Sequence, residues 1–264
     1  MQYFEEFPEL KAKEVRYFKI VIVVMLVLTI ILCANEHSSK VMAVVGEHYE
    51  DSLPIYSVDT EEKVVSITFD AAWGDEDLDD ILDILATHNC KAAFFVTGEW
   101  ATKYPKAIEK IYKNGHDIGN HGANHKHMTK LSKEDMIEEI EGCHTIIKSM
   151  TGIDMTLFRV PYGDYNESVI LAAKSKGYNT VQWDVDSLDW KDYGVDAIVD
   201  KVCNHKDLKN GSIILLHNGS KYTALALDEL LKELEEKGYS FAPLSELIYT
   251  EDYSIDHTGR QFKE

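Results

Sequence analysis

Positive charge is scarce in this sequence. Its 264 residues include 27 lysines and arginines against 46 aspartates and glutamates, a formal net charge of −19 at pH 7. Nucleic acids are bound through basic surfaces, so this balance argues against a nucleic-acid partner. The apolar content of 45% and the charged content of 28% are ordinary for a globular protein. The length allows one domain of up to about 250 residues or two small ones.

Several motifs that define other classes of protein are also missing. The four cysteines form no C-x-x-C pair, so neither a zinc knuckle nor a thioredoxin-like site is expected. They are most simply small buried hydrophobic residues, with a single disulfide left open: Cys33, Cys90, Cys143 and Cys203. No G-x-G-x-x-G or Walker lysine follows the first predicted strand, which leaves nucleotide binding unsupported. No G-x-S-x-G elbow is present, so a serine hydrolase is unsupported as well.

One long hydrophobic run spans residues 20–34 and carries no charge. With Tyr17 and Phe18 included and Lys19 reaching to the interface, it has the minimum length of a membrane-spanning helix. It also has the length of a signal-peptide core. Basic residues precede the run and acidic residues follow it, an arrangement that places the N-terminus inside. We expect a cytoplasmic tail over residues 1–19 and an anchor in the cell membrane. The remainder then works outside the cytoplasm, or is secreted if the signal is cleaved.

Residues 35–62 are polar without sustained periodicity and are predicted to be a linker. Beyond them, short β-rich runs alternate with amphipathic helical patterns up to residue 249, and residues 250–264 are predicted to be a frayed tail. The predicted strands are 64–69, 92–96, a run into His121, 157–159, 180–183 and 212–216. Such alternation indicates a parallel sheet covered by helices, either an open sheet or a closed barrel.

Residues able to do chemistry occur where these strands end. They are Asp70, His121, Arg159, Asp184 with Asp186, and His217. A (β/α) barrel builds its active site at the carboxyl ends of its strands, so the pattern favours a barrel over an open sheet.

The residue types at the strand ends fit a metal-dependent hydrolase. His121 and His125 are four residues apart, a spacing that lets two imidazoles share one divalent ion, although two surface histidines would give the same pattern. Asp70 could take the proton of an attacking water, and His217 could protonate the leaving group. Arg159 beside a carboxylate would keep it ionised. A glycosidase would need paired carboxylates without requiring the histidines.

Five short motifs resemble those of the polysaccharide deacetylase (NodB-homology) family in order and approximate spacing. They are Thr68-Phe-Asp70, His121-Gly-Ala-Asn-His125, Arg159-Val-Pro-Tyr162, Asp186-Ser-Leu-Asp-Trp190 and Leu215-Leu-His217. The resemblance covers roughly residues 64–248. The form Thr-Phe-Asp-Ala-Ala-Trp-Gly74 and the N-terminal run are most similar to the sporulation-associated, PdaB-like branch.

The resemblance implies a distorted (β/α) barrel over residues 63–249. The protein would remove acetyl groups from N-acetylated sugars of a cell-envelope polysaccharide, with peptidoglycan or spore cortex expected. It would use a divalent ion, zinc first, with cobalt or manganese as alternatives. We also expect a monomer. Carried over by motif, the roles are base for Asp70, acid for His217, metal ligands for His121 and His125, orientation of the base for Arg159, oxyanion binding by the N–H of Tyr162, tuning of the acid for Asp189, and substrate contact for Trp190 and Leu215. Trp73 is a further candidate for substrate contact, as an aromatic residue that could stack on a sugar. For Trp73, Tyr162, Trp190 and Leu215, a place in the core is an open alternative. Asp75, Asp184 and Asp186 are expected to be solvated or structural.

The sequence departs from the family pattern at the metal site. Ala71 stands where the family has a second, metal-binding aspartate, with Asp75, Glu76 or His127 as candidates to compensate, and Gly122 replaces the Ser or Thr that braces the second histidine. An active enzyme is therefore weighed against a catalytically weakened glycan-binding or sporulation protein. A third reading keeps the hydrolase and changes its substrate to a small amide or ring.

Overall fold

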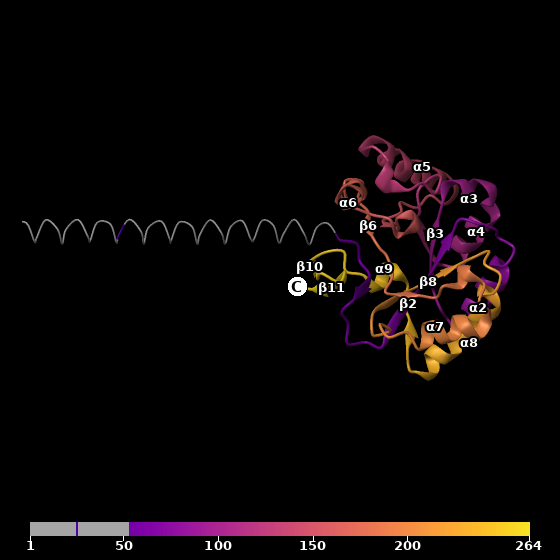
Figure 1. Ribbon diagram of the computed structural model, residues 1–264. Coiled ribbons are helices and arrows are strands. Elements are labelled where there is room, and N and C mark those ends of the chain that lie inside the picture. Colours follow the sequence, from indigo (N-terminus) through magenta and orange to yellow (C-terminus); the bar gives the residue numbers. More distant parts are fainter. Residues whose placement is uncertain (1–24, 26–52) are drawn as a thin grey trace, which may run out of the picture. The chain divides into compact units, whose positions relative to one another are not determined.

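The computed structural model describes Met25 and residues 53–264 (Figure 1). The chain divides into two compact units, Met1–Tyr49 and Glu50–Glu264, and the elements described below all belong to the second. Apart from Met25, the predicted cytoplasmic tail and the predicted anchor lie outside the described residues. Among the helices of the described part, none combines the length and the apolar character needed to cross a membrane.

The second unit alternates strands and helices, as the hydrophobic pattern predicts. Its strands are β1 (Ser57–Val58), β2 (Val64–Ala71), β3 (Ala93–Val96), β4 (Asp117–Asn120), β5 (Leu157–Phe158), β6 (Asn179–Thr180), β7 (Val185–Asp186), β8 (Ser212–His217), β9 (Ser240–Phe241), β10 (Tyr253–Ile255) and β11 (Arg260–Lys263). Its helices are α2 (Leu78–Thr87), α3 (Gly98–Lys103), α4 (Pro105–Lys113), α5 (Lys133–Thr151), α6 (Glu167–Lys174), α7 (Val195–Cys203), α8 (Thr223–Glu236) and α9 (Leu244–Leu247), with 3-10 turns η1 (Met128–Lys130), η2 (Pro161–Gly163) and η3 (Asp189–Lys191).

The parallel strands form a distorted barrel. The order β8-β2-β3-β4-β5-β6 is parallel throughout, β7 also pairs with β8, and β1 pairs antiparallel with β8. A bridge between Ile55, just before β1, and Val181, just after β6, connects the two ends of this path. Figure 1 shows α3, α4 and α5 as one group of helices and α2, α7 and α8 as another around the strands. The predicted distorted (β/α) barrel is confirmed.

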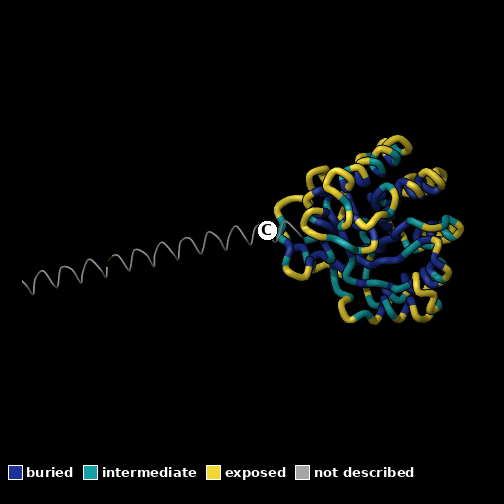
Figure 2. Tube along the Cα trace, turned by 45° about the horizontal axis from the view of Figure 1, so that its top comes forward, coloured by how far each residue is buried: buried dark blue, intermediate teal, exposed yellow. Residues whose placement is uncertain are grey.

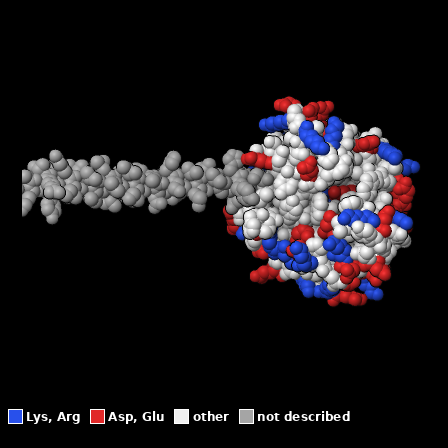
Figure 3. Space-filling model, in the orientation of Figure 1, with Lys and Arg blue, Asp and Glu red and all other residues white. Residues whose placement is uncertain are grey.

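Strand β2 shows why one strand of the barrel carries both core and site residues. Successive side chains of a strand face opposite sides. Val65, Ile67 and Phe69 join the larger apolar cluster, which includes the core-facing residues of the helices. Val64 faces the opposite side of the strand and joins a smaller cluster with Phe95. Asp70 lies six residues after Val64, so it belongs to the same side of the strand as Val64. Figure 2 shows the strands as the buried centre, with the exposed stretches on the helices and loops around them. On the face shown in Figure 3, acidic and basic side chains are interspersed.

Two predicted boundaries are wrong. The predicted linker over residues 35–62 contains Ile55, which is 2% exposed, and β1, which pairs with β8 and β11. The predicted frayed tail over residues 250–264 contains the β10–β11 hairpin. The buried side chain of Gln261 accepts from the N–H of Tyr249 at 2.8 Å and donates to its carbonyl at 2.6 Å, which fixes this hairpin to the barrel. Strands of two to four residues are too short to show an alternating pattern in the sequence. Their place in the sheet depends on partner strands that are distant in the chain.

The described cysteines behave as the sequence suggests. Cys90, Cys143 and Cys203 are buried free thiols, which confirms that they are small hydrophobic core residues.

Candidate active site

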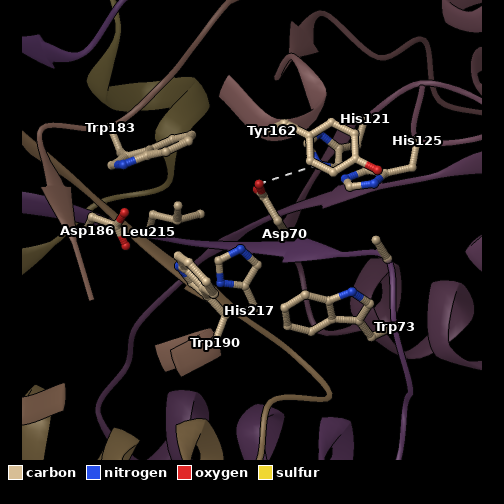
Figure 4. Close-up of a pocket in the computed structure, with 11 residues that line it drawn as sticks. Asp70, Trp73, His121, His125, Tyr162, Trp183, Asp186, Trp190, Leu215 and His217 are labelled. Atoms are coloured by element: carbon tan, nitrogen blue, oxygen red, sulfur yellow. Dashed lines mark ion pairs between the residues drawn. The ribbon is translucent and has the colours of Figure 1, made fainter. Parts of the chain in front are cut away.

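A cavity of about 450 Å³ opens at the carboxyl end of the parallel strands, a size typical of small-ligand sites. It is lined by Asp70, Ala72, Trp73, His121, His125, Tyr162, Trp183, Asp186, Trp190, Leu215 and His217 (Figure 4). Of the ten site residues expected from sequence, only Arg159 and Asp189 are absent from this lining. Both are fully buried behind it, and each contacts a lining residue.

Arg159 holds the carboxylate of Asp70 in place. Its Nη1 donates to Oδ1 of Asp70 and to the hydroxyl of Thr68, both at 2.9 Å. Its other nitrogens donate to the backbone carbonyls of Val181 and Gln182, and the guanidinium lies 4.0 Å from the ring centre of Phe95. With so many contacts, the guanidinium can hold one direction for the carboxylate.

The electrostatics of this pair favour an ionised Asp70. Burial alone would raise the pKa of Asp70, but the interactions with His121 and with Arg159, which adds a hydrogen bond to its charge, outweigh burial and lower that pKa below its usual value. At neutral pH, the cavity therefore presents a carboxylate that can accept a proton.

His121 and His125 lie side by side on the opposite wall. Nδ1 of His121 donates to the carbonyl of Arg159 at 2.8 Å, which leaves Nε2 unprotonated, 3.4 Å from Oδ2 of Asp70. The ring centres of the two histidines are 4.9 Å apart. Burial lowers the pKa of His121. Burial and the neighbouring His121 lower the pKa of His125 to about 4. Both imidazoles are thus neutral at pH 7, the form that binds metal ions.

Glu139, on α5, holds the loop that carries both histidines. It is 2% exposed, and its carboxylate accepts from the backbone N–H and the side-chain amide of Asn124, each at 2.8 Å. Lys126 completes the contact at 2.8 Å. A Cβ on Gly122 would lie 3.5 Å from Glu139 Oε2, so this carboxylate occupies the neighbourhood where a Ser or Thr brace was expected. Sequence reasoning missed Glu139, although a glutamate at helical spacing from Met136 and Cys143 lies on the apolar face of the helix.

The residues present match a divalent ion in donor type, and they fall short of a complete set. His121 and His125 offer two neutral imidazoles, and catalytic zinc sites have three protein ligands. Within residues 53–264 and Met25, no group of three or more His, Cys, Asp or Glu side chains is arranged to hold a metal ion. Ala71 is fully buried in the apolar cluster and offers no donor.

None of the candidates to replace the missing aspartate lines the cavity. Asp75 and Glu76 are not part of its wall. His127 stacks on Tyr162, with ring centres 4.1 Å apart, and its Nδ1 lies 3.4 Å from Oδ2 of Asp164. The expectation that one of them compensates for Ala71 therefore has no support in this geometry.

His217 ends β8 and is fixed by Asp189. Nδ1 of His217 donates to Oδ1 of Asp189 at 2.7 Å, while Thr223 donates to Oδ2 at 2.7 Å. Burial would lower the pKa of His217, but the hydrogen bond and charge of Asp189 outweigh it and raise that pKa. Trp73 stacks on the His217 ring at 5.1 Å between centres, so Trp73 belongs to the cavity wall and not to the core.

Tyr162 adopts a left-handed backbone conformation, with φ 62°. A left-handed conformation costs a non-glycine residue roughly 1–2 kcal/mol. Tyr162 is 58% exposed, and its ring contacts that of His125 at 4.4 Å between centres. Within the described residues, its backbone N–H donates no hydrogen bond. Trp190 is half exposed, and Leu215 is buried at the cavity floor.

The two aspartates that follow the predicted strand 180–183 differ. Asp184 is structural, as expected, because its carboxylate accepts from the N–H of Ile213 at 2.9 Å and from Ser212 at 3.0 Å. Asp186 accepts from the N–H of Leu188 at 2.9 Å and also lines the cavity, a position that the sequence did not indicate. Trp183 also lines the cavity and was not identified from sequence.

Comparisons with known proteins agree with this site. A family model described as polysaccharide deacetylase matches residues 57–181. The peptidoglycan-N-acetylglucosamine deacetylase of Bacillus cereus is 35% identical over 198 residues, covering 73% of this chain and 92% of that protein. The peptidoglycan-N-acetylmuramic acid deacetylase PdaC of Bacillus subtilis is 33% identical over 213 residues, 80% of this chain and 44% of PdaC. The chain likewise spans only 60% of another curated relative.

Solved structures add a second kind of relative. The wild-type BA3943 protein of Bacillus anthracis, a CE4 family pseudoenzyme, matches with a TM-score of 0.72 at 28% identity, over 81% of this chain and 74% of that one. A BA3943 mutant with restored enzymatic activity gives 0.71 at 32% identity, over 74% of this chain and 71% of that one. Membership of the PdaB-like branch stays a prediction. Fold, motifs and matches together confirm that the chain belongs to the polysaccharide deacetylase family of hydrolases.

Proposed function

We propose that this protein removes acetyl groups from N-acetylated sugars of a cell-envelope polysaccharide, with peptidoglycan, including spore cortex, as the expected polymer. The observation that carries the proposal is the pairing of Asp70 with His217. They are register partners on the neighbouring strands β2 and β8, and both face one cavity. One is held as a carboxylate by Arg159, and the other is kept protonated to higher pH by Asp189. A base and an acid with opposite tuning at one site are what amide hydrolysis needs.

The chain's own residues then divide the reaction among them. Asp70 accepts the proton of the attacking water, and the free N–H of Tyr162 stabilises the oxyanion. His217 delivers a proton to the leaving amine nitrogen, and Leu215 contacts the acetyl methyl group. A divalent ion held by His121 and His125, with zinc ahead of cobalt or manganese, would polarise the acetyl carbonyl. With two protein ligands the ion is expected to bind weakly and to be removed easily by chelators.

The proposal extends to location and assembly. Residues 20–34 would anchor a monomer in the cell membrane, or serve as a cleaved signal, with the catalytic unit outside the cytoplasm.

An acetate-release assay on N-acetylated wall fragments tests the activity, run with added Zn²⁺ or Co²⁺ and after chelation. We expect metal-stimulated release that is lost in Asp70→Asn and in His217→Ala. Absence of release from every glycan and metal combination would remove the catalytic proposal. If acetate release persists after full chelation, the role of the divalent ion is refuted and the deacetylase activity itself stands.

The second candidate is a glycan-binding protein without catalysis. Ala71 supports it, because the cavity lacks a third protein ligand, and the similarity to a pseudoenzyme is consistent with it. In that case glycan binding persists in His121→Ala and under chelation, and no acetate is released.

A further inference from the structure

Asp186 presents a free acceptor in the cavity. It is the last residue of β7 and the register partner of Leu215. Its Oδ1 accepts from the backbone N–H of Leu188 at 2.9 Å, which fixes the side chain. Its other oxygen, Oδ2, receives no hydrogen bond from the described part of the chain and is not enclosed by protein. Figure 4 shows this carboxylate near Leu215 and Trp183, away from the two metal-type histidines.

Other ionisable groups of the cavity wall have partners within the protein. Asp70 is paired with Arg159 and His217 with Asp189, while Nδ1 of His121 donates to the backbone carbonyl of Arg159. No lysine or arginine is among the lining residues, although such side chains are spread over the exterior (Figure 3). Among the described residues, the carboxylate of Asp186 therefore has no ion-pair partner in the cavity wall. The positive groups that act on it without contact are His217, which Asp189 holds, and Lys201 of α7 outside the cavity.

We propose that Asp186 determines which sugar the cavity accepts. Its free oxygen takes a hydrogen bond from a hydroxyl of an uncharged N-acetylated sugar, while its charge repels a sugar that carries a carboxylate. The site then prefers N-acetylglucosamine over N-acetylmuramic acid with a free lactyl carboxylate. This inference rests on the proposed function, and the relatives named above, which act on one or the other sugar, do not decide between them.

The test compares two oligosaccharides of equal length. One contains only N-acetylglucosamine, and the other alternates it with N-acetylmuramic acid bearing a free lactyl carboxylate. In the variant Asp186→Asn, the side-chain oxygen still accepts from Leu188 while the charge is removed. The matched control is Asp196→Asn, which removes an exposed carboxylate of α7 outside the cavity.

We expect the unchanged protein to show at least a tenfold higher kcat/KM for the uncharged oligosaccharide. Asp186→Asn should reduce this ratio about tenfold, chiefly by improving use of the charged one, and added salt should reduce it in the unchanged protein. Asp196→Asn should keep the ratio. If the unchanged protein uses both substrates equally, or if Asp186→Asn keeps the ratio within twofold, the inference is overturned.

Calorimetric binding of the same two oligosaccharides under chelation separates this inference from the deacetylase proposal, because binding needs no turnover. A binding preference for the uncharged sugar that disappears in Asp186→Asn supports the inference even if no acetate is ever released. Equal binding of both, or binding of neither, contradicts it. Should Asp186→Asn fail to fold, Asp186→Ser also keeps an acceptor for Leu188 and takes its place.

Discussion

The carboxylate of Asp189 contacts His217 twice, once through the ring and once through the backbone. Oδ1 accepts from Nδ1 of the imidazole and Oδ2 from the backbone N–H of the same residue, each at 2.7 Å. The two contacts fix the ring and its tautomer, so Nε2 is the nitrogen available to exchange protons in the cavity. A fully buried aspartate thus sets both the position and the charge of the proposed acid.

The first prediction concerns this pair. Asp189→Asn removes the negative charge that raises the pKa of His217 against the effect of burial. The pKa of His217 should therefore fall below its present raised value. Because His217 must be protonated to act, the alkaline limb of the pH–rate profile should move to lower pH. We also expect kcat to fall about 10²–10⁴-fold. Thr223→Val, which removes one hydrogen bond from Asp189 and keeps the charge, should move the limb less. An alkaline limb that stays in place in Asp189→Asn would refute the assignment of His217 as the acid.

The second prediction concerns Arg159 and the acid limb. Arg159→Met removes the buried cation, so the pKa of Asp70 should rise and activity should be lost at a higher pH than in the unchanged protein. In the unchanged protein, the free energy of unfolding should also fall as the pH is lowered through the pKa of Asp70. The lowered pKa of Asp70 contributes stability above its unfolded value, and this contribution is lost as pH falls through the folded value. Breaking a buried pair should also cost about 3–5 kcal/mol of unfolding free energy, measured in urea.

Arg260→Met serves as the control for that change. Arg260 pairs with Asp59 at 2.9 Å, and the Asp59 carboxylate is exposed to solvent, where an ion pair contributes about 0–1 kcal/mol. Equal losses of stability in the two variants, or an unshifted acid limb in Arg159→Met, would speak against the proposed role of the buried pair.

The third prediction concerns the histidine loop. Glu139→Ala removes a buried acceptor of three hydrogen bonds, so we expect a loss of about 2–3 kcal/mol in unfolding free energy. Zinc affinity, measured by competition with a chromophoric chelator, should fall about 10–100-fold because the loop that orients His121 and His125 is released. The exposed neighbour Glu138→Ala should change neither quantity. Zinc affinity that survives Glu139→Ala would show that the loop orders itself without this carboxylate.

The fourth prediction concerns stability far from the cavity. His88, after α2, lies 3.0 Å from Asp228 and 3.0 Å from Glu235 on α8. Burial opposes its charge, but the two carboxylates outweigh burial and raise the pKa of His88. Its contribution is then fully present below the unfolded pKa of about 6.5 and is lost as pH rises through the folded value. His88→Gln should therefore be less stable than the unchanged protein at pH 6, with a difference that shrinks by pH 9. A difference independent of pH would point to packing alone.

The local rules of the sequence predicted the main elements well. Ser132 accepts from the N–H of Asp135 at the start of α5, and Asn166 accepts from the N–H of Val169 at the start of α6. Caps of this kind depend on residues three positions apart, so they can be read from the sequence. Site residues at strand ends could be predicted because parallel strands bring their carboxyl ends to one side of the barrel.

By itself, the sequence determined the order of strands and helices, the barrel, and the set of residues that could meet at its mouth, because short-range periodicity and strand direction decide those features. Only the tertiary structure decided that β1 and the β10–β11 hairpin join the sheet, that Glu139 holds the histidine loop, and that Asp186 faces the cavity. Those features depend on contacts between segments far apart in the chain. A two-residue strand or one carboxylate has no local pattern until its partner is placed beside it.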